Sequence, residues 1–309
     1  MRTTTARRGF TIAEFAAILL VGGSVTGMLS ATDPFSRARE TGRQLKDATQ
    51  IRGTHQAMVM WATQNNGRYP LPSLVDRAGL TIGTSGAALD TTANIMSMMV
   101  WNGSVPADLL ISPVETNKAI SQDEDFQYDA PEAATTPERA LWDPAFDADF
   151  TDGKGNMSYA HLLPGGERLD MWRDTFASHQ TIYMTRGPQV TAATPAEDGA
   201  VTPSVANGKS NTLDFFLSES DTRGNSWSTN IAFNDNRVMF WADRITRPHA
   251  EAPFGPVALR RDGYWLTMDD NTRRTDLLTF DEPGHPRNAY HSIFVSAGEK
   301  PSDFKAIWD

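Results

Sequence analysis

The sequence predicts an α+β fold, in which a long N-terminal helix precedes a globular part made of short strands and loops. Three observations predict it. Residues 10–31 form an apolar run of 22 residues. Residues 36–64 then repeat apolar side chains at three- and four-residue steps, the period of an amphipathic helix. Beyond Pro70, short segments rich in β-branched and aromatic residues alternate with loops.

The composition is that of a mostly water-soluble chain with an acidic balance. Its 309 residues have a hydrophobic fraction of 39%, a mean hydropathy of -0.42 and a formal charge of -10. The acidic balance argues against a general nucleic-acid binder, which needs a positive surface to neutralise phosphates. The absence of cysteine excludes disulfides, zinc–thiolate sites, a thiol nucleophile and a lipid-modified cysteine anchor.

The apolar run is long enough to cross a membrane. As a helix rising ~1.5 Å per residue it spans about 33 Å, against a bilayer core of ~30 Å. The one charged residue of the run is Glu14. The run is preceded by nine residues, which include Arg2, Arg7 and Arg8. A carboxylate in lipid costs ~2–3 kcal/mol and usually has a partner. A cleaved secretory signal and a plain uncleaved anchor are two interpretations of such a segment, and neither explains Glu14.

A third interpretation explains the carboxylate. The stretch RRGFTIAEF, residues 7–15, resembles the prepilin processing site of type IV pilins and type II secretion pseudopilins. That family has a basic leader, a Gly, then Phe-Thr, with Glu at the fifth mature position. Gly9, Phe10, Thr11 and Glu14 fit in register. The resemblance implies cleavage between Gly9 and Phe10 by a prepilin peptidase, followed by N-methylation of Phe10.

The resemblance also implies a role for Glu14 in assembly. After cleavage, the Phe10 amine of one subunit is a cation at the same membrane depth as the Glu14 carboxylate of a neighbour. Opposite charges a few ångströms apart attract strongly in a low dielectric. The carboxylate is therefore expected to set the axial register as one subunit docks beside another.

The function implied is a pilin-like structural subunit of a type IV pilus or type II secretion pseudopilus, and not an enzyme. It would cross the inner membrane once, with its head outside the cytoplasm, and then join a periplasmic or cell-surface filament. Its partners would be prepilin peptidase, other pilin or pseudopilin subunits and an inner-membrane assembly platform, with no nucleic acid. The alternative is a membrane-anchored envelope protein that never polymerises and whose head binds an exported polymer or glycan.

Four segments are expected: a leader (1–9), a transmembrane and assembly helix (10–32), its amphipathic continuation (33–67) and a globular α+β head (68–309). Asp33 and Pro34 suit a helix start, and Asn65-Asn66-Gly67 suits its end. In pilin-like proteins this second half of the helix packs on an antiparallel sheet. Its apolar face is predicted from residues at three- and four-residue spacing: Leu45, Ala48, His55, Met58, Val59 and Ala62.

In the head, strands are predicted at residues 180–187, 212–218, 230–241 and 263–268, while residues 121–156 and 188–211 are expected to be loops, the latter mobile. The run NIAFNDNRVMFW (230–241) is typical of a hairpin. It resembles a C-terminal domain found with prepilin-type leaders, in which a His, nine residues and Asp-Gly recur. Here Asp235-Asn236 stands at the Asp-Gly position and Asn225 at that of the His. Asn tolerates positive φ, so Asn236 can keep the turn.

Candidate chemistry in the head is sparse, and no catalytic residue is predicted. Asp147, Asp149 and Asp152 crowd carboxylates into one loop, and calcium favours oxygen ligands of this kind. The spacing departs from the EF-hand pattern, so a solvated loop without any cofactor is the simpler interpretation. His55 lies on the predicted apolar face of the helix and is expected to be a packed, hydrogen-bonded histidine.

Overall fold

The computed structural model describes residues 34–176, 178, 180–187, 190–195, 201–205, 211–215, 226–244, 291–300 and 303–307. The chain divides into two compact units, Met1–Arg43 and Gln44–Asp309. The described part of the first unit is helical, and the second contains all the strands described below. In the described part of the chain, no helix combines the length and the apolar character that crossing a membrane requires; residues 10–31 lie outside that part.

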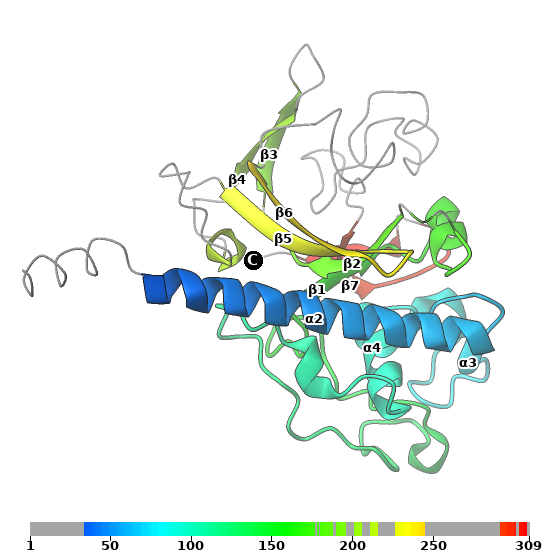
Figure 1. The fold of residues 1–309 in the computed structure, drawn as a ribbon. Coiled ribbons are helices and arrows are strands. Elements are labelled where there is room, and N and C mark those ends of the chain that lie inside the picture. The colour runs from blue at the N-terminus through cyan, green and yellow to red at the C-terminus, as the bar shows by residue number, and fades with distance from the viewer. Residues whose placement is uncertain are drawn as a thin grey trace, which may run out of the picture. The chain divides into compact units, whose positions relative to one another are not determined.

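Helix α2 (Pro34–Gln64) ends where the sequence predicts (Figure 1). Asp33, the predicted cap at its start, lies outside the described residues. Its end is a tight turn in which Asn66 and Gly67 adopt φ of 56° and 74°. The Gly67 N–H closes the turn on the Ala62 carbonyl at 2.8 Å. Asparagine and glycine are the residues that adopt this left-handed conformation most easily, so they stop the helix.

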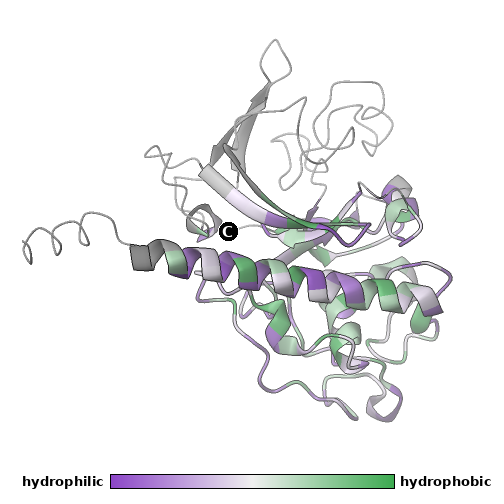
Figure 2. Cartoon of the chain, viewed as in Figure 1, coloured by the Kyte–Doolittle hydropathy of each residue, from purple (hydrophilic) through white to green (hydrophobic). Residues whose placement is uncertain are grey.

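The buried face of α2 is rotated from the predicted one. Leu45, predicted to be buried, is 62% exposed, so that prediction is wrong. His55, Met58 and Ala62 are fully buried, as predicted. The rest of the buried face consists mainly of polar residues that were not predicted to be buried: Asp47, Gln50 and Thr54, together with Ile51 and Ala57. Figure 2 shows polar and apolar residues mixed along this helix. Apolar periodicity misplaced the face because polar side chains occupy half of it.

Six of the described strands form one antiparallel sheet in the order β6-β5-β2-β1-β7-β8. In chain order they are β1 (Tyr159–Leu162), β2 (Thr181–Thr185), β5 (Ser226–Phe233), β6 (Val238–Arg244), β7 (His291–Ser296) and β8 (Lys305–Ile307). A separate two-stranded hairpin consists of β3 (Val190–Pro195) and β4 (Val201–Val205). The predicted class, α+β with a long helix and an antiparallel sheet, is thus confirmed at that level.

Two of the predicted strands are confirmed, one is wrong, and one predicted loop contains strands. Residues 181–185 form β2, and 230–241 lie in the β5–β6 hairpin, where Asn236 has φ of 64°. Residues 211–214 instead form the short 3-10 helix η6 (Asn211–Asp214), and 188–211 contain the β3–β4 hairpin rather than a loop alone. The predicted strand 263–268 and Asn225 lie outside the described residues. Residues 121–156 are loops apart from η3 (Pro137–Arg139), as expected.

Helix α4 (Thr92–Trp101) was missed by the sequence analysis, and it lies in the core of the head. Seven of its residues from Asn94 to Val100 are buried. A helix that is buried on nearly every side has no exposed polar face, so it lacks the amphipathic period that sequence patterns reveal. Its ends carry local signals all the same: the Thr91 hydroxyl caps the Asn94 N–H at 3.3 Å, and Gly103 follows the helix with φ of 66°.

The main core joins α2 and α4 to the sheet. It contains Met58 of α2, Met96 of α4, Tyr159 of β1, Tyr183 of β2 and Ile231 of β5. The other short helices are α3 (Pro72–Val75), η1 (Gly86–Leu89), η2 (Ala107–Leu110) and η4 (Gly166–Met171). Burial of these side chains supplies most of the stabilising free energy, at ~25 cal/mol per Å² of apolar surface removed from water.

Candidate functional site

The residues predicted to be processed or to drive assembly, Gly9, Phe10 and Glu14, lie outside the described residues. The described structure instead shows how the helix that follows them is fixed to the head. Two polar clusters on the inner face of α2 make this connection. They are centred on Asp47 and His55, eight residues apart, which is about 12 Å along a helix.

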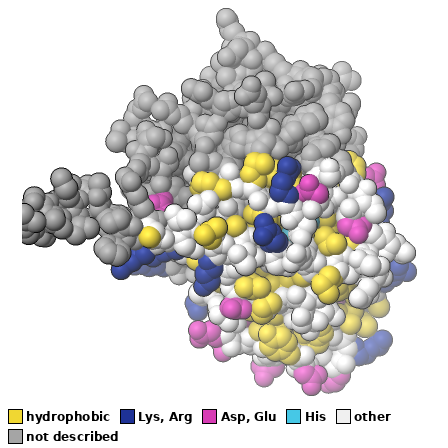
Figure 3. All heavy atoms as spheres, viewed as in Figure 1, with side chains coloured by type: hydrophobic (Ala, Val, Ile, Leu, Met, Phe, Trp, Pro, Cys, Tyr) yellow, Lys and Arg dark blue, Asp and Glu magenta, His cyan; other side chains and the backbone are white. Residues whose placement is uncertain are grey.

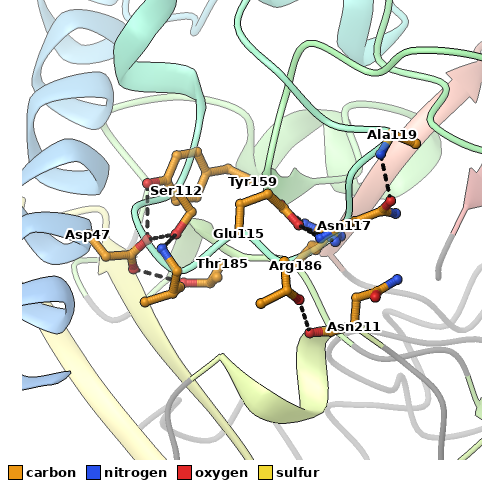
Figure 4. Close-up of polar contacts among 11 residues, drawn as sticks. Asp47, Ser112, Glu115, Asn117, Ala119, Tyr159, Thr185, Arg186 and Asn211 are labelled. Carbon is orange, nitrogen blue, oxygen red and sulfur yellow. Dashed lines mark hydrogen bonds and ion pairs between the residues drawn. The ribbon is translucent and has the colours of Figure 1, made fainter. Parts of the chain in front are cut away.

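The Asp47 cluster joins α2 to three strands and one loop (Figure 4). The Asp47 carboxylate is fully buried and accepts four side-chain hydrogen bonds. Figure 4 shows those from Ser112, Tyr159 and Thr185. At Oδ1 the donors are Ser112 Oγ (2.5 Å) and the Tyr159 hydroxyl (3.0 Å). At Oδ2 they are Thr185 Oγ1 (3.0 Å) and Asn230 Nδ2 (2.8 Å). Tyr159, Thr185 and Asn230 lie on β1, β2 and β5, so one carboxylate ties the helix to three adjacent strands.

The directions of these hydrogen bonds are set by second partners. Ser112 Oγ accepts the Val114 N–H at 3.3 Å, and Thr185 Oγ1 accepts the Asn230 N–H at 3.4 Å. Because each of these hydroxyls already accepts a hydrogen bond, its own proton is available to Asp47. The Asn230 amide nitrogen can only donate, and it also contacts the Gln44 carbonyl at 3.1 Å. The cluster is therefore arranged around an acceptor.

Two effects oppose each other at this carboxyl. Burial raises the pKa of Asp47 above its ordinary value, because a charge in a low-dielectric interior loses its hydration. The hydrogen bonds from Asn230, Ser112, Tyr159 and Thr185 act in the opposite direction by favouring the carboxylate. Burial is the larger effect. Placing an acid here therefore costs stability, whereas its four directional bonds specify one position of the helix on the sheet.

The His55 cluster attaches the helix to the head about two turns further on. His55 Nε2 lies 3.1 Å from the Tyr69 hydroxyl, which in turn donates to Asn234 Oδ1. The Asn234 amide is oriented by two backbone carbonyls, those of Asp174 and Phe176, each 3.1 Å from Nδ2. The Tyr69 proton therefore points to Asn234, and His55 Nε2 must carry the proton that bonds to Tyr69.

The second ring nitrogen of His55 contacts the turn of the β5–β6 hairpin. Asn236 Oδ1 lies 3.0 Å from Nδ1. An oxygen at this place accepts a proton from Nδ1, so the arrangement suits a His55 ring that is protonated on both nitrogens. A neutral ring has no proton on Nδ1 and needs a donor there. Rotating the Asn236 side-chain amide by half a turn about χ2 places its nitrogen at this position and supplies that donor. Burial lowers the pKa of His55, while Asn236 and Asp235 oppose that shift. The expectation of a packed, hydrogen-bonded His55 is confirmed, and the left-handed Asn236 is what brings the hairpin turn to it.

A buried ion pair lies beside the Asp47 cluster, directly after Thr185. The Arg186 guanidinium forms a bidentate pair with Glu115, with 3.0 Å between Nη2 and Oε1 and a shorter contact between Nη1 and Oε2. The two side chains are 2% and 5% exposed. The guanidinium carbon also lies 5.2 Å and 5.0 Å from the ring centres of Phe150 and Phe215. Two aromatic faces and a bidentate acid together compensate the desolvation of this cation.

The predicted calcium ligands are used as turn caps in the structure. Asp147 Oδ1 accepts the Asp149 N–H at 2.8 Å, and Asp149 Oδ1 accepts both the N–H and the hydroxyl of Thr151. Asp152 is exposed in the same loop. Among the residues that the structure describes, no group of three or more acids or histidines is placed to share a metal ion. The side-chain geometry here is that of consecutive Asx-turns.

Two further histidines, His161 and His291, are buried, and we expect them to lower the folding stability of the protein in acid. Burial lowers the pKa of His161 to about 4 and that of His291 to about 3. The ordinary value is 6.5, so below pH 6.5 the unfolded chain binds protons that the folded chain does not, and stability falls as the pH falls from 6.5 towards 4. Each histidine contributes a slope of ~1.4 kcal/mol per pH unit in that range.

Other groups face these histidines or oppose their effect. His161 Nε2 contacts the Thr92 hydroxyl at 2.7 Å, and the Arg168 charge lies near His291 and lowers its pKa further. Asp90, with a pKa raised to about 6 by burial, gains protons on folding and offsets part of the slope between pH 6 and 4. Urea unfolding as a function of pH should show a flatter profile for His161→Gln and a steeper one for Asp90→Asn. Identical slopes in all three proteins would contradict these assignments.

Comparison with known proteins returns no match: no family model, no curated protein and no solved structure matches the chain. The site residues therefore stand on this chain's own sequence and geometry. Sequence analysis missed Asp47, Thr185 and Asn230. One signal was available, since Asp47 lies seven and eight positions before Thr54 and His55 and so belongs to the same helix face.

Proposed function

We propose that the chain is a pilin-like structural subunit, inserted in the inner membrane through residues 10–32 and assembled into a type IV pilus or type II secretion pseudopilus after removal of residues 1–9. The observation that carries this proposal is the register of Gly9, Phe10 and Glu14 behind a basic leader and at the start of an apolar run. Prepilin peptidase, other subunits and an assembly platform are the partners that such a role requires.

The described architecture supports the proposal in one respect. A subunit that joins a filament through its N-terminal segment must transmit displacement of that segment to its head. Apolar packing alone resists sliding weakly, because it has no direction, whereas hydrogen bonds weaken steeply with misalignment. Asp47 and His55 give α2 two directional attachments to the sheet. A helix attached in this way is suited to connect a membrane segment to a head.

The decisive experiment is mass spectrometry of the protein purified from its native membrane. We expect a chain that starts at Phe10 and carries one methyl group on its amine. Losing the leader removes Arg2, Arg7 and Arg8, so the formal side-chain charge moves from -10 to -13. Deleting Gly9 should leave the precursor uncut, while Thr5→Ala in the leader should not. A native N-terminus at Met1, or one near Thr32, would contradict the proposal.

A non-polymerising anchored protein is the competing function, and the same sample separates the two. An anchored envelope protein would keep Met1 and would remain monomeric after crosslinking in the membrane. A subunit would be processed and would crosslink into ladders. If the chain is processed but forms no crosslinked ladders, the proposed prepilin-like cleavage stands and the proposed assembly into a filament is wrong.

A further inference from the structure

The start of α2 carries a basic segment between an apolar run and an acidic head. Within residues 34–46 the charged side chains are four basic and one acidic: Arg37, Arg39, Glu40, Arg43 and Lys46. The segment therefore has a formal charge of +3. Residues 1–46 contain seven basic and three acidic side chains, a net charge of +4. Because the whole chain has a net charge of -10, residues 47–309 have a net charge of -14. The net charge is therefore positive at the start of α2 and strongly negative over the rest of the chain.

Three of these basic residues share one side of the helix. Arg39, Arg43 and Lys46 follow one another at steps of four and three, which places them within an arc of roughly 60°. All three are exposed, and none forms an ion pair with another described residue. Lys and Arg side chains gather beside the first described turns of α2 in Figure 3. We call Arg39, Arg43 and Lys46 the basic stripe.

We propose that the basic stripe binds anionic phospholipid headgroups at the outer surface of the membrane that residues 10–31 are expected to cross. This inference rests on the membrane insertion in the proposed function but not on filament assembly. Arg39 comes eight residues after Ala31, the last residue of the apolar run, which is ~12 Å at a helical rise. A headgroup layer is about 5–8 Å thick on each side of the hydrocarbon core, so the Arg39 side chain reaches it.

The position of the other two basic residues implies a tilted helix. Lys46 comes fifteen residues after Ala31, ~22 Å along an upright helix. On an upright helix, Lys46 would therefore lie beyond the headgroups by more than the Debye length of ~8 Å, so salt would screen its attraction to them. Because the three residues share one side, tilting α2 towards that side brings all of them to the surface together. An anionic membrane is therefore expected to hold α2 tilted, and a neutral membrane is not.

The opposite charge of the head makes this orientation specific. Residues 47–309, with a net charge of -14, are repelled by an anionic surface, whereas the basic stripe is attracted to it. Each basic side chain close to such a surface strengthens binding roughly fivefold. Three of them together give about a hundredfold preference for the anionic surface over a neutral one, and high salt removes it.

The test uses a fluorescent label on the full chain. The protein has no cysteine, so Gly42→Cys supplies a unique labelling site, and a Cβ at this position meets no atom within 4 Å. Gly42 lies between Arg39 and Lys46 on the same side of α2. The labelled protein is reconstituted in phosphatidylcholine vesicles, with and without phosphatidylglycerol, and quenched with acrylamide. We expect quenching to fall at least twofold in the anionic vesicles and to return to the neutral-vesicle value in high salt.

A charge-matched pair of variants locates the effect. Arg39→Gln/Arg43→Gln/Lys46→Gln should abolish the protection, whereas Arg52→Gln/Arg77→Gln/Lys154→Gln, which removes three exposed basic residues elsewhere, should keep it. Equal quenching in both vesicle types would overturn the proposal, as would equal loss in both variants. Protection in neutral vesicles that grows with protein density would overturn it too, because the stripe would then bind the acidic head of a second copy. Flotation with neutral vesicles reports insertion of the apolar run separately.

Discussion

Replacing Glu14 with Ala should abolish assembly while leaving membrane insertion and cleavage intact. Insertion should improve, because a costly carboxylate leaves the apolar run. Cleavage should persist, because the Gly9-Phe10 junction is unchanged. Assembly should fail, because the Phe10 amine of the neighbouring subunit loses its counter-charge in a low dielectric. Deleting one partner of a buried pair costs ~3–5 kcal/mol, and a loss near 4 kcal/mol is about a thousandfold in association.

Three measurements on the same cells separate these steps: the membrane fraction, the N-terminal mass and the length of crosslinked oligomers. Glu14→Gln should behave as Glu14→Ala does, because it also lacks the negative charge. Glu40→Ala is the matched control, since it removes a carboxylate from the same N-terminal helical region but outside the apolar run. If Glu14→Ala and Glu14→Gln are both processed and still form ladders of normal length, Glu14 is not the docking charge and the plain anchor becomes the better explanation.

Replacing Asp47 with Ala should cost the head about 3 kcal/mol or more in unfolding free energy. The change leaves the donors of Ser112, Tyr159, Thr185 and Asn230 without their common acceptor inside the core. A buried donor without a partner costs ~1–3 kcal/mol, although the hydroxyls can partly pair with one another. Asp47→Asn should cost less, because it keeps an acceptor at Oδ1 but presents an amide nitrogen to the Asn230 amide nitrogen.

Urea unfolding of a chain lacking residues 1–35 measures these differences directly. Asp108→Asn, an exposed carboxylate beside the same helix, is the control and should change stability little. A second readout is pH. Burial raises the pKa of Asp47 above that of the unfolded chain, so its folded state gains protons, and the wild type should gain stability relative to Asp47→Asn as the pH is lowered from neutral. Equal stability of Asp47→Ala and wild type would show that the cluster does not fix the helix.

The sequence by itself determined those features that depend on neighbouring residues. Asn66-Gly67 ends α2 because both residues adopt positive φ. Asn236 makes the β5–β6 turn for the same reason. The α+β class follows from the change of period after Pro70. The candidate processing and docking residues, Gly9, Phe10 and Glu14, also come from a local motif, and they rest on sequence alone.

Only the tertiary structure decided what lies on the inner face of α2. The four partners of Asp47 are 65, 112, 138 and 183 residues away in the chain, so no local pattern could bring them together. Periodicity assigned Leu45 to the core because apolar side chains are usually buried, yet directional hydrogen bonds to three strands turned Asp47 inwards and left Leu45 exposed. Burial and hydrogen bonding are properties of the assembled sheet, whereas φ preferences and helical spacing belong to the chain itself.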